Sequence, residues 1–141
     1  MTEPADSPVD WVKRHIDRYV ATDGADGHFW QGTQTLLLTA TGRTSGVPRR
    51  TALIYAEDGD DLLVVASKGG ADEHPLWYLN VQAHPEVHVQ VGARKLQATA
   101  RTATAAEKAR LWPLVVAVWP AYEDYQAKTA RDIPVVVLSP V

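Results

Sequence analysis

The chain has 141 residues, the size of one domain, and its 45% hydrophobic and 22% charged residues are ordinary for a folded globular protein. It contains no cysteine, which excludes disulfides, thiolate metal sites and cysteine nucleophiles. The formal net charge is −3 and the basic region is too small to track a nucleic-acid backbone, so no nucleic-acid partner is expected.

The first segment predicts an amphipathic helix. Ser7 followed by Pro8, with Asp10 three residues after Ser7, is typical of a helix N-cap, and apolar residues then recur at helical spacing. We therefore divide the chain into an N-terminal helix and linker, 1–31, and one barrel domain, 32–141. The helix is expected to dock on the domain or on a dimer partner rather than on a membrane.

No secretory signal and no long apolar run is visible. The N-terminus is acidic and polar, and every apolar run is far shorter than the roughly 20 residues that cross a bilayer. We expect a cytoplasmic protein without an integral membrane segment, with contact at the inner membrane face as an open alternative.

Strand patterns dominate the rest of the chain. About six strands are predicted, at 34–41, 50–56, 62–66, 86–91, 96–103 and 134–138. Asp58 and Gly59 form a hairpin turn between the second and third. The strand order is expected to be meander-like, and the lack of long strand-helix-strand alternation favours a mainly antiparallel barrel of the α+β kind.

Three short helices are expected among these strands, at 75–81, from 104 onward, and at 121–129. Thr104 with Glu107 three residues later is a capping box. The helix that it opens should bury a stripe made of Leu111, Leu114, Val115 and Val118.

The most informative stretch of the sequence has no acidic residue from position 29 to position 56, and it contains the loop 42–50. The glycines of this loop could turn backbone amides toward an anion, while Arg43 and Arg49 supply forked donors. The spacing matches neither a Walker loop nor a dinucleotide fingerprint. A solvated hairpin loop explains the pattern equally well.

A second loop repeats this chemistry, because a strand ends in Ser67, Lys68, Gly69 and Gly70. Two glycine-rich cationic turns in one small domain indicate that both converge on one ligand, a phosphorylated small molecule. The five histidines show no metal spacing, and neither a nucleophile elbow nor a pair of carboxylates is visible.

Aromatic residues lie at helical spacing near the C-terminus. Trp119, Tyr122 and Tyr125 share one side of the last short helix. Such residues are usually core, and a pocket wall with phenol donors is the competing interpretation.

Four motifs together carry a family resemblance: 38–49, 66–71, 74–80 and 119–126. With these motifs in the same order, the chain resembles the deazaflavin-dependent nitroreductase family of actinobacteria, over about 36–141. The resemblance implies a split β-barrel that binds coenzyme F420, an 8-hydroxy-5-deazaflavin with an anionic phosphate and polyglutamate tail.

The same resemblance implies roles for individual residues. The phosphate end would be held by Arg43, Thr44, Ser45 and Arg49. The ring would be lined by Arg50, Thr51, Ala52, Leu53 and Ile54. Contacts from the neighbouring strand would come from Val65, Ala66, Ser67 and Lys68. The site would be closed by Leu76, Trp77, Tyr78, Leu79 and Asn80. Tyr122 would lie near the ring and the substrate, with Tyr125 in support.

The implied reaction is hydride transfer from reduced F420 to a quinone, a coumarin-like enone or a nitroaromatic, and Tyr122, Tyr125 or Ser67 would assist at the oxygen where charge develops. Ile54 and Trp119 stand where the best-known nitro-drug activator of the family has tyrosines, so nitroimidazole activation is not carried over. Two alternatives stay open: an FMN- or haem-binding split-barrel protein, and a non-catalytic F420 carrier. The chain could be a monomer or a homodimer.

Overall fold

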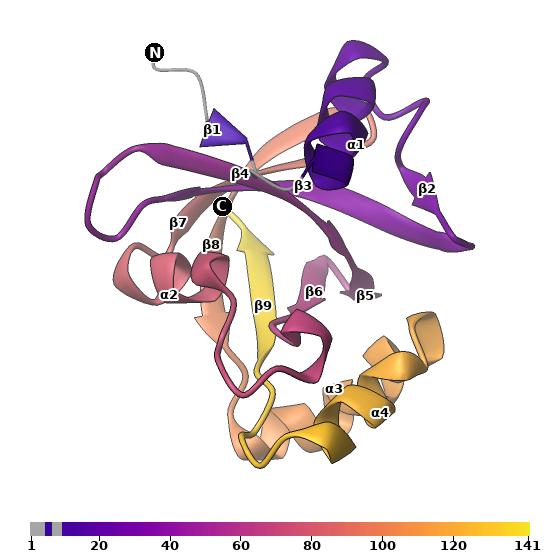
Figure 1. Cartoon of the computed structure of the whole chain (residues 1–141), viewed down its shortest axis with the longest axis vertical. Coiled ribbons are helices and arrows are strands. Elements are labelled where there is room, and N and C mark those ends of the chain that lie inside the picture. The colour runs from indigo at the N-terminus through magenta and orange to yellow at the C-terminus, as the bar shows by residue number, and fades with distance from the viewer. Residues whose placement is uncertain (1–4, 7–9) are drawn as a thin grey trace.

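The computed structural model describes residues 5–6 and 10–141 (Figure 1). The strands are β1 (Ala5–Asp6), β2 (Phe29–Trp30), β3 (Thr33–Thr41), β4 (Pro48–Ile54), β5 (Ala56–Asp58), β6 (Asp61–Val65), β7 (Glu86–Val91), β8 (Arg94–Thr102) and β9 (Val135–Pro140). The helices are α1 (Asp10–Ala21), the 3₁₀ turn η1 (Lys68–Gly70), α2 (Leu76–Ala83), α3 (Ala105–Val118) and α4 (Ala121–Lys128). The six longer strands match the six predicted ones.

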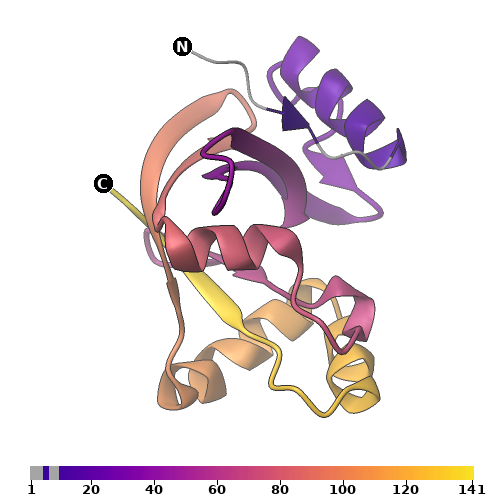
Figure 2. The ribbon, with the colours of Figure 1, turned by 60° about the vertical axis from the view of Figure 1, so that its left-hand side comes forward.

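The strands form one curled sheet in the order β1-β4-β3-β7-β8-β9-β6-β5, with β2 paired to β3. Every pairing is antiparallel except β1 with β4. The expected meander is wrong: β7 pairs with β3 instead of β6, and β9 lies between β8 and β6. The segment from η1 to α2 causes this change, because it carries the chain from one half of the sheet to the other (Figure 2).

The predicted strand 50–56 is also corrected, because it breaks at Tyr55. Up to Ile54 the chain pairs with β3, and from Ala56 onward it pairs with β6. Tyr55 is therefore a corner that joins the two ends of the sheet, and this connection curls the sheet into a split barrel.

The barrel interior is apolar. One cluster of buried side chains fills it, and Tyr78 and Val81 of α2 belong to this cluster. Its fully buried members include Leu36, Leu38, Val64, Val136 and Leu138. Full burial of such a side chain contributes about 1.5–3 kcal/mol. The helix α2 thereby closes the interior of the barrel (Figure 2).

Strands β6 and β9 are buried on both faces. Alternate residues such as Leu63 and Val137 face a second cluster, formed with α3 and α4. The capping box of α3 is confirmed, since Thr104 Oγ1 accepts from the Glu107 amide and Glu107 accepts from the Thr104 amide.

The buried stripe of α3 is narrower than predicted. Leu111 and Val115 are buried, Val118 is partly buried, and Leu114 is 39% exposed. The prediction for Leu114 is wrong because α3 rests on the sheet and α4 through one row of side chains, which leaves Leu114 at the margin.

The amphipathic helix α1 docks on the domain, as expected. Ile16 and Tyr19 are fully buried against Leu37 of β3, with Ala52 of β4 packed beside them. The Tyr19 hydroxyl donates to the Thr35 carbonyl at 3.0 Å and accepts from the Gly92 amide at 2.6 Å.

The predicted N-cap at Ser7 and Pro8 lies outside the described residues. In the described part of the chain, no helix is both long and apolar enough to cross a bilayer.

Candidate functional site

The β3–β4 loop is a compact turn. The Gly42 amide donates to the Val47 carbonyl at 2.8 Å, and the Gly46 amide donates to the Gly42 carbonyl at 2.9 Å. Gly46 has a φ of +71°, which favours glycine. Ser45 Oγ accepts from the Val47 amide at 3.2 Å, so one function of this hydroxyl is to hold the loop. Arg43, Thr44 and Ser45 are exposed on its rim.

Arg49 and Arg50 point to opposite faces of β4. Arg49 is exposed, pairs across the ladder with Ala40 of the barrel interior, and passes close to Gly42. The Arg50 Nε donates to Asp6 Oδ1 at 2.6 Å, and both side chains of this ion pair are less than one fifth exposed. The charge of Arg50 is therefore already neutralised on the other side of the sheet from Arg49.

The same alternation divides the predicted ring-lining run. Thr51 and Leu53 face the barrel interior together with Leu36 and Leu38, whereas Ala52 packs with the α1 cluster. The side chains of Arg50 and Ala52 therefore cannot line the same ring face as Thr51 and Leu53. Only their backbone is available there.

A groove of about 390 Å³ lies on the outer face of the sheet. It is lined by Val20, Leu37, Thr39, Arg50, His88, Val89, Gln90, Lys95, Leu96 and Gln97. Arg50 is the one predicted site residue in its wall, so this groove is separate from the rest of the predicted site.

The turn after β6 has an unusual backbone. Ser67 is right-handed (φ −81°, ψ −39°), and Lys68, Gly69 and Gly70 follow at φ values of +47°, +63° and +84°. A right-handed residue followed by a left-handed one makes a nest, a concave set of amides suited to an anion. The amides of Ser67, Lys68 and Gly69 have no hydrogen-bond partner among the described residues. Lys68 Nζ lies 3.8 Å from Glu73 in an exposed, weak ion pair.

Arg131, which the sequence interpretation did not select, holds this turn from beneath. Its guanidinium donates to the carbonyls of Ala66 (3.1 Å), Ser67 (2.7 Å) and Ala71 (2.7 Å), and it lies 3.2 Å from His74 Nδ1. The separation of about 60 residues between donor and acceptors hides the contact from any local sequence pattern.

The helix α2 contacts the arginine loop. Asn80 Oδ1 accepts from the Arg43 amide at 3.0 Å. Tyr78 is buried, and its hydroxyl contacts Thr102 at 2.7 Å and Gln82 at 3.1 Å, so its side chain is engaged in the fold. Leu76 is 70% exposed and Trp77 packs partly against the barrel interior, with Leu79 also half-buried.

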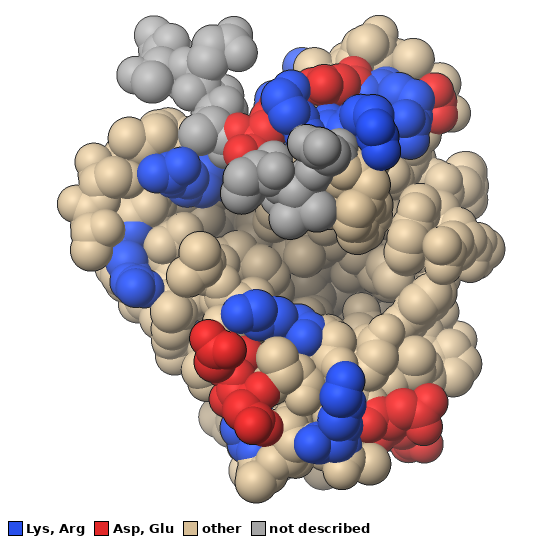
Figure 3. Space-filling view, viewed as in Figure 1, with Lys and Arg blue, Asp and Glu red and all other residues tan. Residues whose placement is uncertain are grey.

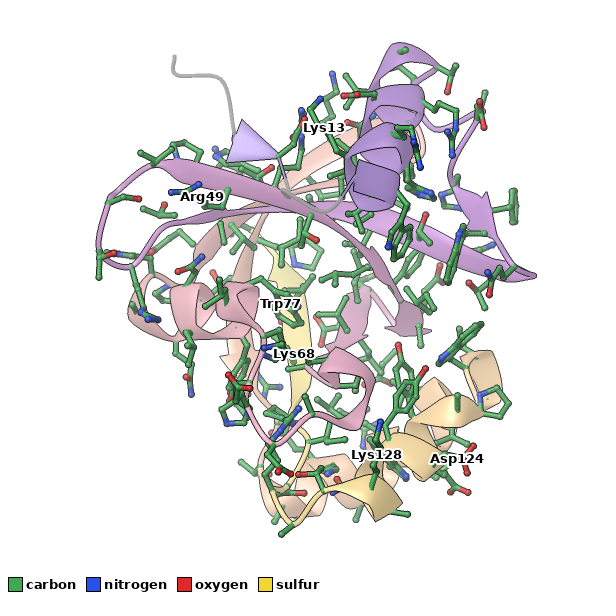
Figure 4. The ribbon with its side chains drawn as sticks, in the orientation of Figure 1. Lys13, Arg49, Lys68, Trp77, Asp124 and Lys128 are labelled. Carbon is green, nitrogen blue, oxygen red and sulfur yellow. The ribbon has the colours of Figure 1, made fainter. Side chains whose placement is uncertain are left out.

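The face that carries these segments is hollowed (Figure 3). Seen from the same side, Arg49 lies at the upper left of the hollow, and Trp77 and Lys68 lie along its lower part (Figure 4). The two predicted anion-binding segments therefore border one concave surface.

A second group of predicted residues lies on the side of the sheet that α3 and α4 cover. Ile54, Val65 and Tyr122 surround a gap between β4, β6, α3 and α4 that is too small to hold a water molecule. Tyr122 is 6% exposed, and burial raises its pKa above the usual phenol range, with a smaller contribution from Tyr125. Its hydroxyl is therefore neutral at physiological pH and can donate a hydrogen bond.

Tyr125 connects the nest to an aromatic row that runs across the molecule. A Cβ on Gly70 would lie 2.8 Å from the Tyr125 carbonyl oxygen, so the turn and α4 are in close contact. Trp119 Nε1 lies 3.5 Å from the Tyr125 hydroxyl, and its ring lies 5.8 Å from Trp30, which stacks on Trp11 at 5.7 Å. Trp119 caps the C-terminus of α3 and is not part of the last helix, which corrects the prediction that it shares a side of that helix with Tyr122 and Tyr125. Sequence reasoning missed Trp11 and Trp30, because the contact between Trp30 and Trp119 joins residues far apart in the chain.

Comparison with known proteins identifies the fold. A solved structure described as a domain-swapped dimer has a TM-score of 0.73 and 40% identity, covering 94% of this chain and 100% of that one. The structure of an F420-H2 dependent reductase has a TM-score of 0.70 and 42% identity, covering 74% of this chain and 93% of that one. The chain thus has the split-barrel fold of F420-dependent reductases.

The sequence comparisons give the family. The F420H(2)-dependent quinone reductase family matches residues 11–140. An F420H(2)-dependent quinone reductase of Mycobacterium tuberculosis is 40% identical over 142 aligned residues, covering 92% of this chain and 95% of the relative. This chain belongs to the F420H(2)-dependent quinone reductase family, a family of oxidoreductases that use coenzyme F420, which confirms the resemblance, the enzyme class and the cofactor.

Proposed function

We propose that this protein reduces a quinone with two electrons from reduced F420, and that the hollowed face between Arg49 and Lys68 is the cofactor site. The observation that carries this assignment is the nest at Ser67–Gly69, whose amides have no partner among the described residues and whose Lys68 borders the same hollow as Arg49 (Figure 4). Free amides next to exposed cations fit the phosphate and carboxylates of the F420 tail.

When bound, the reduced deazaflavin supplies a hydride, and a proton from solvent or a phenol completes the conversion of a quinone to a hydroquinone. The residues of this chain bind and orient. Arg43 and Arg49 donate to the anionic tail from one side, and the Ser67–Gly69 amides and Lys68 Nζ donate from the other. These contacts would fix the position of the cofactor ring relative to the acceptor, which lowers the entropic barrier of the transfer.

The neutral hydroxyl of Tyr122 is the proposed hydrogen-bond donor to the acceptor oxygen, where negative charge develops. Tyr125, in contact with Trp119, is proposed to support it or to donate directly, and the Ser67 hydroxyl has no partner among the described residues and is a third candidate.

The remaining predicted contacts stay part of this proposal, with one change. Side chains are proposed to contact the cofactor from Thr44, Ser45, Thr51, Leu53, Leu76, Trp77, Leu79 and Asn80. Ile54 and Val65, which lie beside Tyr122 on the opposite face of the sheet, are proposed to contact it beyond the ends of their strands. Four further residues would contribute through their backbone: Arg50, Ala52, Ala66 and Tyr78. The side chains of Arg50, Ala52 and Tyr78 are engaged elsewhere, and Ala66 has only a buried methyl group. Enones and nitroaromatics are proposed as further acceptors, with Ile54 and Trp119 shaping the pocket.

Ligand titration tests the cofactor, and turnover tests the reaction. We expect F420 to bind and reduced F420 to be oxidised on addition of menadione. Tight FMN binding without F420 binding would contradict the cofactor assignment. Binding without oxidation by menadione, nitroaromatics or coumarins would make the protein a carrier.

Substitution of the arginine loop tests the location of the site. Arg43→Ala and Arg49→Ala should each weaken F420 binding by roughly tenfold or more, because a charge-assisted hydrogen bond contributes about 1.5–3 kcal/mol. Arg14→Ala, on the exposed face of α1, is the matched control. Unchanged F420 affinity in both loop variants would remove the loop from the site.

We further propose a homodimer and transient contact with the inner membrane face. A similar solved structure is a domain-swapped dimer, and Trp11 and Phe29 are 53% and 71% exposed on one end of this molecule. Light scattering would give the mass in solution, and cosedimentation with anionic vesicles, compared between the wild type and Phe29→Ser, would test the membrane contact.

A further inference from the structure

Arg131 binds the nest turn through all three nitrogens of its guanidinium. Its Nε and both terminal nitrogens reach the carbonyls of Ala66, Ser67 and Ala71 and the ring of His74. These acceptors lie before, within and after the nest, so a single guanidinium fixes both ends of the turn and its first residue.

The turn needs such a support because its backbone is strained. Lys68 has a φ of +47°, a conformation that a residue with a Cβ adopts only when its surroundings impose it. In a trans peptide the N–H points opposite to the carbonyl of the preceding residue. Because Arg131 binds the Ala66 and Ser67 carbonyls, the Ser67 and Lys68 amides point away from its guanidinium. The Lys68 carbonyl accepts from the Ala71 amide at 3.1 Å, which fixes the direction of the Gly69 amide. A nest that is formed before the anion arrives binds it without the entropic cost of ordering the loop.

Arg131 is itself held by α4. Gln126 Nε2 donates to the Arg131 carbonyl at 2.7 Å, while Gln126 Oε1 accepts from the Ile133 amide at 2.9 Å and from Lys108 Nζ at 3.0 Å. Thr129 adds a second tie to the same loop through Asp72, at 2.8 Å. The nest is therefore anchored to the helix that carries Tyr122 and Tyr125.

We propose that Arg131 is a positioning residue that preorganises the Ser67–Gly69 nest for the anionic tail of the cofactor without touching that cofactor. This inference rests on the proposed function. It predicts that replacing Arg131 weakens binding only of ligands that carry the phosphate and carboxylates of the tail.

The decisive measurement compares two ligands with each variant. We expect Arg131→Met to weaken binding of F420 roughly tenfold, and to change binding of the same deazaflavin lacking its phosphate and polyglutamate by less than twofold. Arg110→Met, which removes an exposed guanidinium paired with Asp58, is the control and should alter neither affinity. Equal losses for both ligands would mean that Arg131 only supports the fold, and would overturn the proposal.

A more conservative change covers the case in which Arg131→Met does not fold. Arg131→Lys keeps the charge but offers one ammonium in place of a planar fork, so we expect it to fold and to show the same selective loss of F420 affinity. Full F420 affinity in Arg131→Lys would overturn the proposal, since charge alone would then suffice.

A measurement on the unliganded wild type separates this inference from the proposed function. In amide NMR spectra, titration with inorganic phosphate should shift the Ser67, Lys68 and Gly69 signals most, and Arg131→Lys should reduce those shifts. Phosphate shifts elsewhere, or shifts unaffected by Arg131→Lys, would overturn the inference. A wild type that binds phosphate at the nest but no deazaflavin would instead overturn the proposed function.

Discussion

At Gly70 the backbone leaves no room for a side chain. A Cβ there would lie 2.8 Å from the Tyr125 carbonyl oxygen and 2.9 Å from the Tyr125 Cα, and the φ of +84° adds conformational strain. We expect Gly70→Ala to lower the free energy of unfolding by about 2–4 kcal/mol, measured by urea denaturation. Gly59 has a φ of +61° and a Cβ there would meet nothing within 4 Å, so Gly59→Ala should lower the free energy of unfolding clearly less. Equal costs would mean that the contact with Tyr125 is unimportant.

Tyr122 is the residue whose removal should separate catalysis from binding. Because burial keeps its phenol protonated, Tyr122→Phe removes a donor and leaves the ring packing intact. We expect kcat with menadione to fall about tenfold or more, with the F420 dissociation constant within threefold of the wild type. Stopped-flow oxidation of reduced F420 measures the first and fluorescence titration the second. An unchanged kcat would shift the donor role to Tyr125 or Ser67.

Some of these residues could be predicted from the sequence and others could not. The cationic loops, Tyr122 and the capping box at Thr104 are visible in the sequence, because each depends on near neighbours. The opposite directions of Arg49 and Arg50 follow from strand alternation once β4 is known to begin at Pro48. Arg131 could not be found, since its acceptors are distant in sequence and are backbone carbonyls, which every residue has.

At the scale of elements, the helix α1 depends on a buried histidine. His15 is 4% exposed and its Nε2 lies 3.3 Å from Thr35 Oγ1. Burial, aided by Arg18, lowers the His15 pKa below 6.5. The unfolded chain therefore binds more protons than the folded one, so stability falls as the solution is acidified below about pH 6.5 toward the depressed pKa.

We therefore expect the free energy of unfolding to be steady above pH 7 and to decline between pH 6.5 and pH 5. His15→Gln should flatten this decline, and His88→Gln, on the exposed side of β7, should not. Some slope will remain in His15→Gln, because burial and Arg131 also lower the pKa of His74. Denaturation curves at several pH values give the test, and a decline that is identical in all three proteins would contradict it.

The elements themselves were largely predictable and their pairing was not. The hairpin at Asp58 and Gly59 follows from turn chemistry, and it is confirmed by the pairing of β5 with β6. The corner at Tyr55 and the position of β9 between β6 and β8 depend on contacts between distant parts of the chain. A continuous apolar run such as 135–138 shows burial on both faces but does not say which strands lie beside it.

The protein as a whole is negatively charged, but its candidate cofactor site is lined by exposed cations. The formal charge is −3, yet Arg43, Arg49 and Lys68 are all exposed at the candidate site. We expect the F420 dissociation constant to rise several-fold between about 0.05 and 0.5 M salt, because exposed charges are screened over that range. The KM for menadione, an uncharged acceptor, should change little. A salt-independent F420 affinity would argue against binding through the anionic tail.

The row of Trp11, Trp30 and Trp119 has an optical consequence. The rings of Trp11 and Trp30 are nearly parallel, with 14° between their planes, and Trp30 lies 5.8 Å from Trp119, which caps the C-terminus of α3 just before α4. Indoles at such distances couple their excited states, so the near-ultraviolet circular dichroism of this protein should contain a signal that disappears in Trp30→Phe. The chain therefore carries an intrinsic spectroscopic reporter of whether its N-terminal helix remains attached to the half of the molecule that holds Tyr122.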